Sequence, residues 1–305
     1  MMKTTRFFLI LMILFIAACT NQALPRKIPS AEEINQKSAQ LKAITDANRE
    51  AHNARDEKAI QALFSEDVLF DDVTFEDHLV GIKALMEFTH LGFIFLPNFH
   101  WEAKGHFIGS EQIVRIAKFW GANMSGNPNK VYTEDNPFIH VFLYELKGDL
   151  ITTWQLFYGY DFLKDNGLLS KTVASTMQSW PSSYASAWSS LDSKVVRGLY
   201  ARDAVRQDTL FGESQEGCSA IQSFAETFFS WYPKTRWTPH LIFGERKWPD
   251  KPQAVGSTFT IEVSDSSDKT CEVLAVVLLQ VLDGKIIQED LYYEPESLIR
   301  CGWAK

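Results

Sequence analysis

The sequence lacks several patterns that would each point to a class of function. It has 30 Lys and Arg residues against 38 Asp and Glu, and no basic run of the kind that follows phosphates, so nucleic acid is not expected as a partner. After residue 18, no apolar stretch reaches the roughly 18 residues that a membrane-spanning helix needs. Cys-x-x-Cys, His-x-His and His-Glu-x-x-His spacings are all absent, so a thiol redox centre or a metal site has no support. We therefore expect no metal and no other cofactor.

Cysteine is also scarce. The chain has four cysteines, and the three that follow Cys19 are Cys218, Cys271 and Cys301. An exported chain would permit one disulfide, which would leave one thiol over. Buried free thiols, which pack as small apolar side chains, are the interpretation that we favour from sequence. The pairing itself is left open at this point.

The first 18 residues have the features of an export signal. Lys3 and Arg6 precede an apolar run at 7–16, which is too short to span a bilayer and is typical of a signal core. Removing these two residues leaves 28 basic and 38 acidic residues, a net charge of about −10. Residues 16–19, IAAC, resemble the lipobox of bacterial lipoproteins.

The lipobox resemblance implies cleavage before Cys19 and attachment of acyl chains such as palmitate to its thiol and new amino terminus. Two acyl chains are enough for stable membrane anchoring. Thr20 stands where Asp would retain an enterobacterial lipoprotein in the inner membrane, so the expected location is the outer membrane, facing the periplasm. A plain signal peptide that happens to be followed by cysteine is the alternative.

The main signal in the rest of the chain is an internal repeat at a separation of 136 residues. Residues 56–88 align without a gap to residues 192–224, with nine identities in 33 positions, where unrelated sequences would give roughly two. The same separation relates Pro97 to Pro233 and Trp101 to Trp237. A period this long indicates duplicated globular domains, because solenoid repeats run roughly 20 to 50 residues.

Both copies show the same order of predicted elements. Ser30 and Glu33 form a capping box before a first helix, and Asp56 and Asp192 cap the helix that follows in each copy. A glycine precedes a third helix, and the hydrophobic pattern then changes to the period of two that is typical of strands. The stretches 139–146 and 272–282 are apolar on both faces, so we expect strands covered on both sides.

The stretch LFSEDVLFDD at 63–72, with a glycine nine residues after Asp72, is similar to the nuclear-transport-factor-2-like superfamily, which includes ketosteroid isomerase and the SnoaL-like polyketide cyclases. The resemblance implies an α+β fold with two tandem cone-shaped domains, each a curved, mostly antiparallel sheet wrapped around about three helices and an apolar cavity. We expect a signal peptide at 1–18, a tether at 19–29, a first domain at 30–165, a linker at 166–181 and a second domain at 182–305. This fold hosts enzymes, binders and scaffolds, so it does not decide the function.

The same resemblance gives four candidate catalytic residues. Ketosteroid isomerase uses an aspartate base opposite a tyrosine and a protonated aspartic acid. That pattern puts Asp72 and Asp208 at the base position, Tyr184 at the tyrosine position of the second copy, and His140 at the acid position of the first. Neither copy holds the full trio, and each missing oxyanion donor commonly weakens catalysis by about 3 kcal/mol. The structural alternatives are turn or strand-end aspartates and packed core residues at 140 and 184.

Aromatic residues on the expected strands of the first copy are suited to lining a cavity for a flat apolar ligand. They are Trp101, Phe142, Tyr144 and Trp154, with Tyr158 beyond them, and ordinary core packing would explain the same residues. The leading functional prediction is therefore a membrane-anchored envelope lipoprotein that binds a small apolar or aromatic molecule. An acid–base enzyme of the isomerase or polyketide-cyclase type is the second hypothesis. The third is a protein-interaction module, with the two domains paired within the chain or a homodimer between chains.

Overall fold

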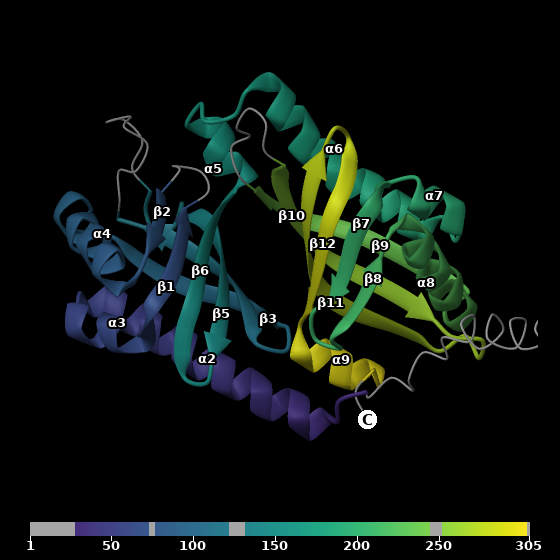
Figure 1. Ribbon diagram of the computed structural model, residues 1–305, viewed down its shortest axis with the longest axis horizontal. Helices are drawn as coiled ribbons and strands as arrows, with labels where there is room; N and C mark the ends of the chain where they lie inside the picture. Colours follow the sequence, from purple (N-terminus) through teal and green to yellow (C-terminus); the bar gives the residue numbers. More distant parts are fainter. Residues whose placement is uncertain (1–27, 73–76, 122–131, 245–251, 304–305) are drawn as a thin grey trace, which may run out of the picture.

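The computed structural model describes residues 28–72, 77–121, 132–244 and 252–303, and its two halves share one order of elements (Figure 1). The first half runs through α2 (Ala31–Ala54), α3 (Glu57–Leu63), β1 (Phe64–Asp72), β2 (Asp77–Val80), α4 (Ile82–Phe95), β3 (His100–Ile108), β4 (Gln112–Trp120), β5 (Phe138–Lys147) and β6 (Leu150–Gly159). After the connecting helix α5 (Tyr160–Asp165), the second half runs through α6 (Lys171–Ser189), α7 (Ser193–Arg197), β7 (Tyr200–Asp208), β8 (Glu213–Glu216), α8 (Cys218–Trp231), β9 (Lys234–Gly244), β10 (Gln253–Ser264), β11 (Thr270–Leu282), β12 (Lys285–Tyr293) and α9 (Pro295–Cys301). The α+β fold with two tandem halves is thus as the sequence predicted.

The predicted helix starts are confirmed by their capping hydrogen bonds. Glu33 N donates to Ser30 Oγ over 3.1 Å, and Ser30 N donates to Glu33 Oε2 over 2.7 Å. Asp56 caps α3 and Asp192 caps α7, each accepting a backbone N–H of the first turn. These side chains satisfy amide groups that have no partner within the helix.

Glycine is required at the entrance to the third helix of each half. Gly81 has φ +87° and Gly217 has φ +83°, a backbone conformation that other residues rarely adopt. Gly81 N donates to Val68 O over 2.8 Å, and Gly217 N donates to Ala204 O over 2.7 Å. The turn therefore brings the start of α4 back onto β1, and the start of α8 back onto β7.

The predicted linker at 166–181 needs correction. Residues 171–181 belong to α6, which occupies in the second half the place that α2 has in the first. Pro181 lies inside this helix, although proline in a helix interior usually breaks or kinks the helix. Only residues 166–170 therefore connect the helices α5 and α6.

No helix within the described ranges is long and apolar enough to cross a membrane.

Each half folds its strands into a curved, mostly antiparallel sheet. In the first half β1 runs parallel to β6, and β6, β5, β4 and β3 follow as antiparallel neighbours. In the second half β7 runs parallel to β12, followed by β11, β10 and β9. Register shifts interrupt both sheets, at 103–105 and 145–146 in the first and at 257–259 and 280–281 in the second. Such bulges bend a sheet.

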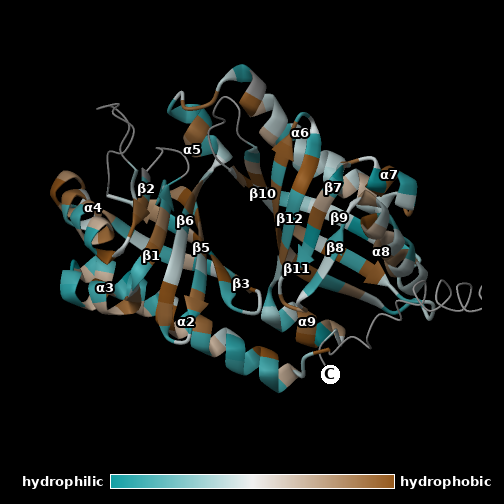
Figure 2. Ribbon diagram, in the orientation of Figure 1, coloured by the Kyte–Doolittle hydropathy of each residue, from teal (hydrophilic) through white to brown (hydrophobic). Residues whose placement is uncertain are grey.

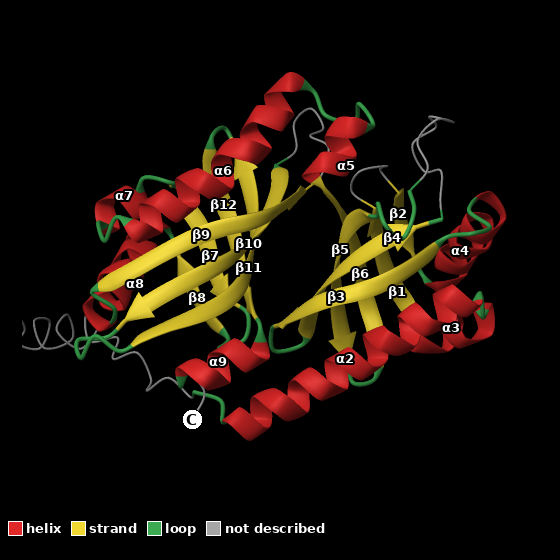
Figure 3. Ribbon diagram, turned by 180° about the vertical axis from the view of Figure 1, so that it is seen from behind, coloured by secondary structure: helices red, strands yellow, loops and turns green. Residues whose placement is uncertain are grey.

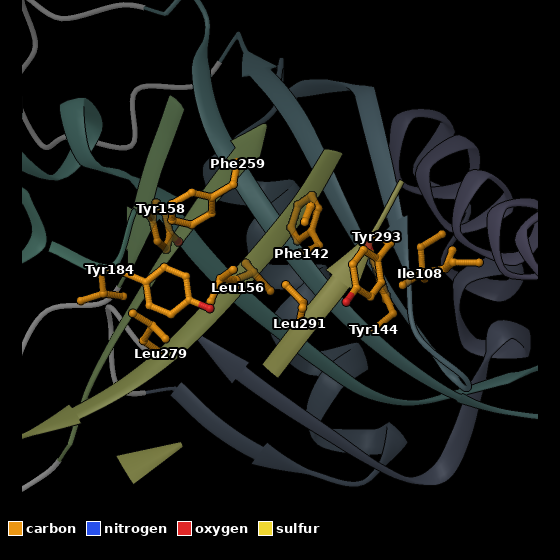
Figure 4. Packing of buried hydrophobic residues seen from close by; sticks show 14 of the residues in the cluster. Ile108, Phe142, Tyr144, Leu156, Tyr158, Tyr184, Phe259, Leu279, Leu291 and Tyr293 are labelled. Atoms are coloured by element: carbon orange, nitrogen blue, oxygen red, sulfur yellow. The ribbon is translucent and has the colours of Figure 1, made fainter. Parts of the chain in front are cut away.

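The prediction that the strands at 139–146 and 272–282 are covered on both faces is confirmed for the first strand and for the middle of the second. The residues of β5 are largely buried on either side, whereas β11 is buried on both faces only in its middle, at 275–279, and exposes one face toward its ends. The main apolar core lies between the helices and the sheets and takes residues from both halves (Figures 2 and 4). The helices α3 and α4 lie at one end of the molecule and α7 and α8 at the other, which leaves the sheets toward the middle (Figures 1 and 3).

The two sheets meet each other in the middle. β6 pairs with β9 through Tyr158 and Gly244, and β12 pairs with β3 through Tyr293 and Ile108. A second apolar cluster draws on strands of both halves; it consists of Phe107, Val114, Val141, Leu143, Phe157, Phe243, Val276 and Tyr292. We call it the inter-half cluster.

The cysteines correct the expectation of free thiols. Cys271 and Cys301 form a disulfide with a Cα–Cα distance of 5.6 Å, and only Cys218 of the described cysteines is a buried free thiol. The sequence could not show this pairing because the contact depends on α9 folding back against β11. The bond therefore ties the last helix to the second sheet.

Candidate functional site

Each half encloses a cavity between its helices and its sheet. The first cavity, in the first half, has a volume of about 130 Å³ and is lined by His52, Asp72, Phe88, Thr89, Gly92, Phe93, Leu96, Phe99, Trp101, Phe119, His140, Phe142, Trp154, Leu156 and Tyr158. The second cavity, in the second half, has about 350 Å³ and is lined by Ile28, Trp188, Arg206, Asp208, Phe211, Phe224, Phe228, Trp231, Tyr232, Trp237, Ile261, Leu291, Tyr293, Gly302 and Trp303. Aromatic side chains dominate both walls.

A buried carboxylate–tyrosine pair is present in both cavities. Tyr158 Oη donates to Asp72 Oδ2 over 2.7 Å, and Tyr293 Oη donates to Asp208 Oδ2 over 2.7 Å. Each aspartate is the last residue of its strand, and each lies opposite a leucine of the parallel neighbour, two residues before the tyrosine. Both carboxylates are almost completely buried. The duplication has therefore preserved this pair in both halves.

The sequence reasoning did not find this pair. A constant separation of 136 residues aligns Tyr158 with Glu294. In the structure the residue equivalent to Tyr158 is Tyr293, at a separation of 135. The two hairpin turns have the same length, but glycine is the first turn residue in KGDL at 147–150 and the second in LDGK at 282–285, so matching the glycines shifts the strands by one residue. Alignment by strand register rather than by the turn glycines would have shown the second tyrosine.

Asp72 and His140, predicted from different parts of the first copy, line the same cavity. His140 lies on β5 with 1% of its surface exposed. Its ring stacks on Phe119 with centroids 4.5 Å apart and meets the edge of Tyr158 at 4.1 Å. Burial lowers the pKa of His140 to about 3, so the imidazole is neutral at physiological pH. The neutral ring can donate one hydrogen bond and accept another, but it is not an imidazolium that could act as a general acid.

Asp208 and Tyr184 are not brought together in the same way. Asp208 lines the second cavity, where it also accepts Phe211 N over 3.3 Å. Tyr184 is fully buried behind the cavity wall, and its Oη donates to Glu289 Oε1 over 3.0 Å. Burial and the nearby Glu289 charge raise the pKa of Tyr184 well above its usual value. The tyrosine beside Asp208 is instead Tyr293.

Glu289 is the centre of a buried polar network that sequence reasoning missed. Arg206 Nε lies 2.9 Å from Glu289 Oε1, and both side chains are almost fully buried. Tyr200 also donates to Glu289. Burial opposes the charged form of Arg206, but the negative charge of Glu289 more than offsets this and raises the pKa of Arg206. Arg206 reaches the second cavity, where its guanidinium lies 4.2 Å from the centroid of Phe224.

The predicted ligand-binding aromatics are placed in two ways. Trp101, Phe142 and Trp154 line the first cavity. Tyr144 does not: it stacks against Trp154 at 5.9 Å, and its hydroxyl accepts Asn48 Nδ2 over 3.2 Å. Tyr144 therefore supports the wall rather than forming it.

A further cavity residue, His52, was not singled out from sequence. Its Nδ1 donates to Asn48 O over 2.9 Å, one helical turn earlier in α2. The direction of this bond follows from chemistry, since a carbonyl oxygen only accepts. Burial lowers the pKa of His52 to about 4.

Within the described residues, no group of three or more His, Cys, Asp or Glu side chains could hold a metal ion.

No protein-family model matches the sequence, and no curated protein matches it either. Similar solved structures include a protein of ketosteroid-isomerase-like fold from Catenulispora acidiphila in complex with trimethylamine, with 16% identity over 41% of this chain and 92% of that one and a TM-score of 0.35. A protein described as a SnoaL-like polyketide cyclase from Shewanella putrefaciens has 12% identity over 41% and 94%, with a TM-score of 0.35. An epoxide hydrolase from M. tuberculosis has 14% identity over 41% and 88%, again with a TM-score of 0.35.

Proposed function

We propose that the protein binds a small apolar or aromatic molecule in its second cavity. The observation that carries this proposal is the volume of about 350 Å³ enclosed largely by aromatic side chains. Ligand cavities usually measure roughly 300 to 1,000 Å³ and combine apolar walls with a few convergent polar groups. Here the polar groups are the Asp208–Tyr293 pair and the Arg206 guanidinium. A ligand with a hydrogen-bond donor suits the carboxylate.

The mouth of the second cavity supports the same proposal. Trp231 ends α8 and is 49% exposed, although it lines the cavity. Tyr232 and Trp303 stack beside it with ring centroids 5.6 Å apart. An exposed tryptophan next to half-buried aromatic side chains forms an apolar patch of the kind that is typical of binding surfaces. An incoming aromatic molecule would cover them.

The test uses 2-naphthol, which has two fused rings and one hydroxyl donor. We expect quenching of tryptophan fluorescence and a rise in melting temperature, because a ligand of the folded state stabilises it. Trp231→Ala should weaken binding about tenfold with little change in stability. Phe95→Ala is the matched control, since Phe95 occupies the same place at the end of α4 and is 73% exposed. Equal effects of the two substitutions, or no response to 2-naphthol, would reject the proposal.

A second candidate function is acid–base chemistry in the first cavity. The specific observation is that the Asp72 carboxylate lines a cavity beside a neutral histidine, which can donate a hydrogen bond to a carbonyl oxygen. A base positioned in this way typically accelerates proton transfer by about 10²- to 10⁴-fold. Exchange of the α-protons of cyclohexanone with deuterated water, followed by NMR, measures such activity directly. Asp72→Asn should reduce the exchange rate to that in buffer alone, and Asp208→Asn should leave it unchanged. An unchanged rate in Asp72→Asn would contradict the hypothesis.

The proposed anchor at Cys19 lies outside the described residues. Ile28, nine residues after it, lines the second cavity. Nine extended residues reach about 30 Å at most, so an anchored chain would hold this cavity close to the membrane surface. Cys19→Ser should yield a folded protein that fractionates away from membranes. Continued membrane association of that variant would exclude lipidation at this position.

A further inference from the structure

His140 is the one described side chain in the first cavity whose two ring nitrogens both lack a hydrogen-bond partner among the described residues. It lies on the central strand β5, opposite Tyr158 of β6. The equivalent position in the second half, opposite Tyr293, is Ala275. The histidine is therefore not a requirement of the fold, because the other half forms the same strand without it.

Leaving a buried imidazole without hydrogen bonds is unfavourable. Native structures satisfy nearly all buried polar groups, and an exception calls for an explanation such as an absent ligand. Because burial lowers the pKa of His140 to about 3, the ring is neutral and carries one N–H donor and one nitrogen acceptor. A hydroxyl group can satisfy either nitrogen, and a carbonyl oxygen can satisfy the donor.

The cavity around His140 is small and has apolar walls. Its volume is about 130 Å³, and an engineered apolar cavity of about 150 Å³ is known to hold benzene. Phe119, Phe142 and Phe138 surround the imidazole, with ring centroids 4.5 to 5.7 Å away. One six-membered ring fits this space, and two fused rings do not.

We propose that the first cavity is a separate binding site for a single-ring apolar molecule that carries one hydroxyl or carbonyl group, with that group hydrogen-bonded to His140. This proposal requires neither ligand binding in the second cavity nor turnover in the first. Asp72 Oδ2 already accepts the hydroxyl of Tyr158, whereas both ring nitrogens of His140 are still available for a hydrogen bond to a ligand. The two halves would then select ligands of different size.

Phenol and toluene form the test pair, because they have nearly the same shape and differ in the hydroxyl group. We expect the full-length protein to bind phenol about tenfold more tightly than toluene, as one hydrogen bond to an otherwise unpaired group would give. In His140→Phe, which keeps an aromatic ring of similar size, this preference should disappear while toluene still binds. His240→Phe, at an exposed histidine of β9, is the matched control and should keep the preference.

Histidine NMR provides a second measurement that does not depend on the variant folding. The imidazole nitrogen signals of His140 should shift on addition of phenol and change little with toluene. 2-Naphthol should leave these signals unchanged, because it exceeds the cavity. The proposal is overturned by equal affinities for phenol and toluene, by a preference that survives in His140→Phe, or by phenol binding that leaves the His140 signals in place.

Discussion

At the residue scale, the two halves fill one equivalent buried position with side chains of opposite character, apolar in the first half and charged in the second. Phe70 and Trp154 face each other across β1 and β6, with ring centroids 5.1 Å apart. The same register in the second half holds Arg206 and Glu289. One chain thus contains an apolar pair and a buried ion pair at equivalent places. The ion pair needs Tyr184 and Tyr200 as additional donors, because burying two charges is costly unless the geometry compensates.

We predict that Glu289→Gln lowers the free energy of unfolding by about 3 to 5 kcal/mol. The substitution keeps the shape but leaves the Arg206 charge buried without its partner. Adding Arg206→Met removes that charge, so the double variant should be more stable than Glu289→Gln alone. Urea denaturation of Glu289→Gln, Arg206→Met and the double variant, each compared with the wild type, gives the coupling energy. Additive losses would show that the pair does not interact as its geometry indicates.

Because two histidines are buried in their neutral form, we predict that the free energy of unfolding depends on pH. The pKa of His140 is about 3 in the folded protein and 6.5 ordinarily, so the unfolded chain binds the proton more readily. Its contribution is complete above pH 6.5 and is lost as the pH falls toward 3. His52 acts in the same direction, whereas Asp290, whose pKa burial raises to about 6, acts in the opposite one.

The contribution of His140 is measured as a difference. Between pH 6 and pH 4, stability should fall less steeply in His140→Phe than in the wild type, by roughly 1 to 1.5 kcal/mol per pH unit. Denaturation midpoints in urea across this range provide the measurement. Parallel slopes in the two proteins would mean that His140 is solvated or protonated in the folded state.

At the element scale, features set by neighbouring residues were predictable and features set by distant ones were not. The capping bonds of Ser30, Asp56 and Asp192 each span only a few residues, and a local motif reports them. The Asp72–Tyr158 bond joins residues 86 positions apart through a parallel strand pair. Sequence reasoning placed both residues in one copy but had no means of fixing their register.

The disulfide between β11 and α9 allows a prediction at this scale. It joins residues 30 positions apart, and a loop of that length corresponds to about 3 to 4 kcal/mol of stabilisation. Cys271→Ser with Cys301→Ser should lower the free energy of unfolding by that amount. Trp303, two residues beyond the bond, contacts Tyr293 and Tyr232 at the second cavity, so 2-naphthol should bind more weakly.

The first cavity provides the control for this double variant. It lies in the other half, so the preference for phenol over toluene should be unchanged. A similar loss of binding in both cavities would indicate general unfolding rather than release of α9. Unchanged stability would mean that packing alone holds α9 against β11.

At the scale of the whole molecule, the two halves form one continuous set of strands. The repeat predicted two copies of one fold. It could not predict how the copies contact each other, because equal spacing along the chain contains no information about that contact. How β6 meets β9 and how β12 meets β3 depends on the shape of the outer sheet faces, which no local pattern reports. Phe157 of the first half and Phe243 of the second lie 6.0 Å apart between ring centroids. Both rings belong to the inter-half cluster.

Gly256 offers a narrow test of that cluster. A methyl group there would come within 2.2 Å of Phe243 Cε2 and 2.8 Å of Leu278 Cδ2, so the Phe243 ring must move and its packing on Phe157 is disturbed. We predict that Gly256→Ala lowers the free energy of unfolding by about 1 to 3 kcal/mol and separates thermal unfolding into two transitions, since the halves then lose their shared contact. Gly105→Ala is the matched control: it also lies in a strand but meets nothing within 4 Å, and it should be neutral or slightly stabilising. Calorimetry distinguishes the outcomes, and a single transition in Gly256→Ala with the stability of Gly105→Ala would show that the inter-half cluster does not couple the two halves.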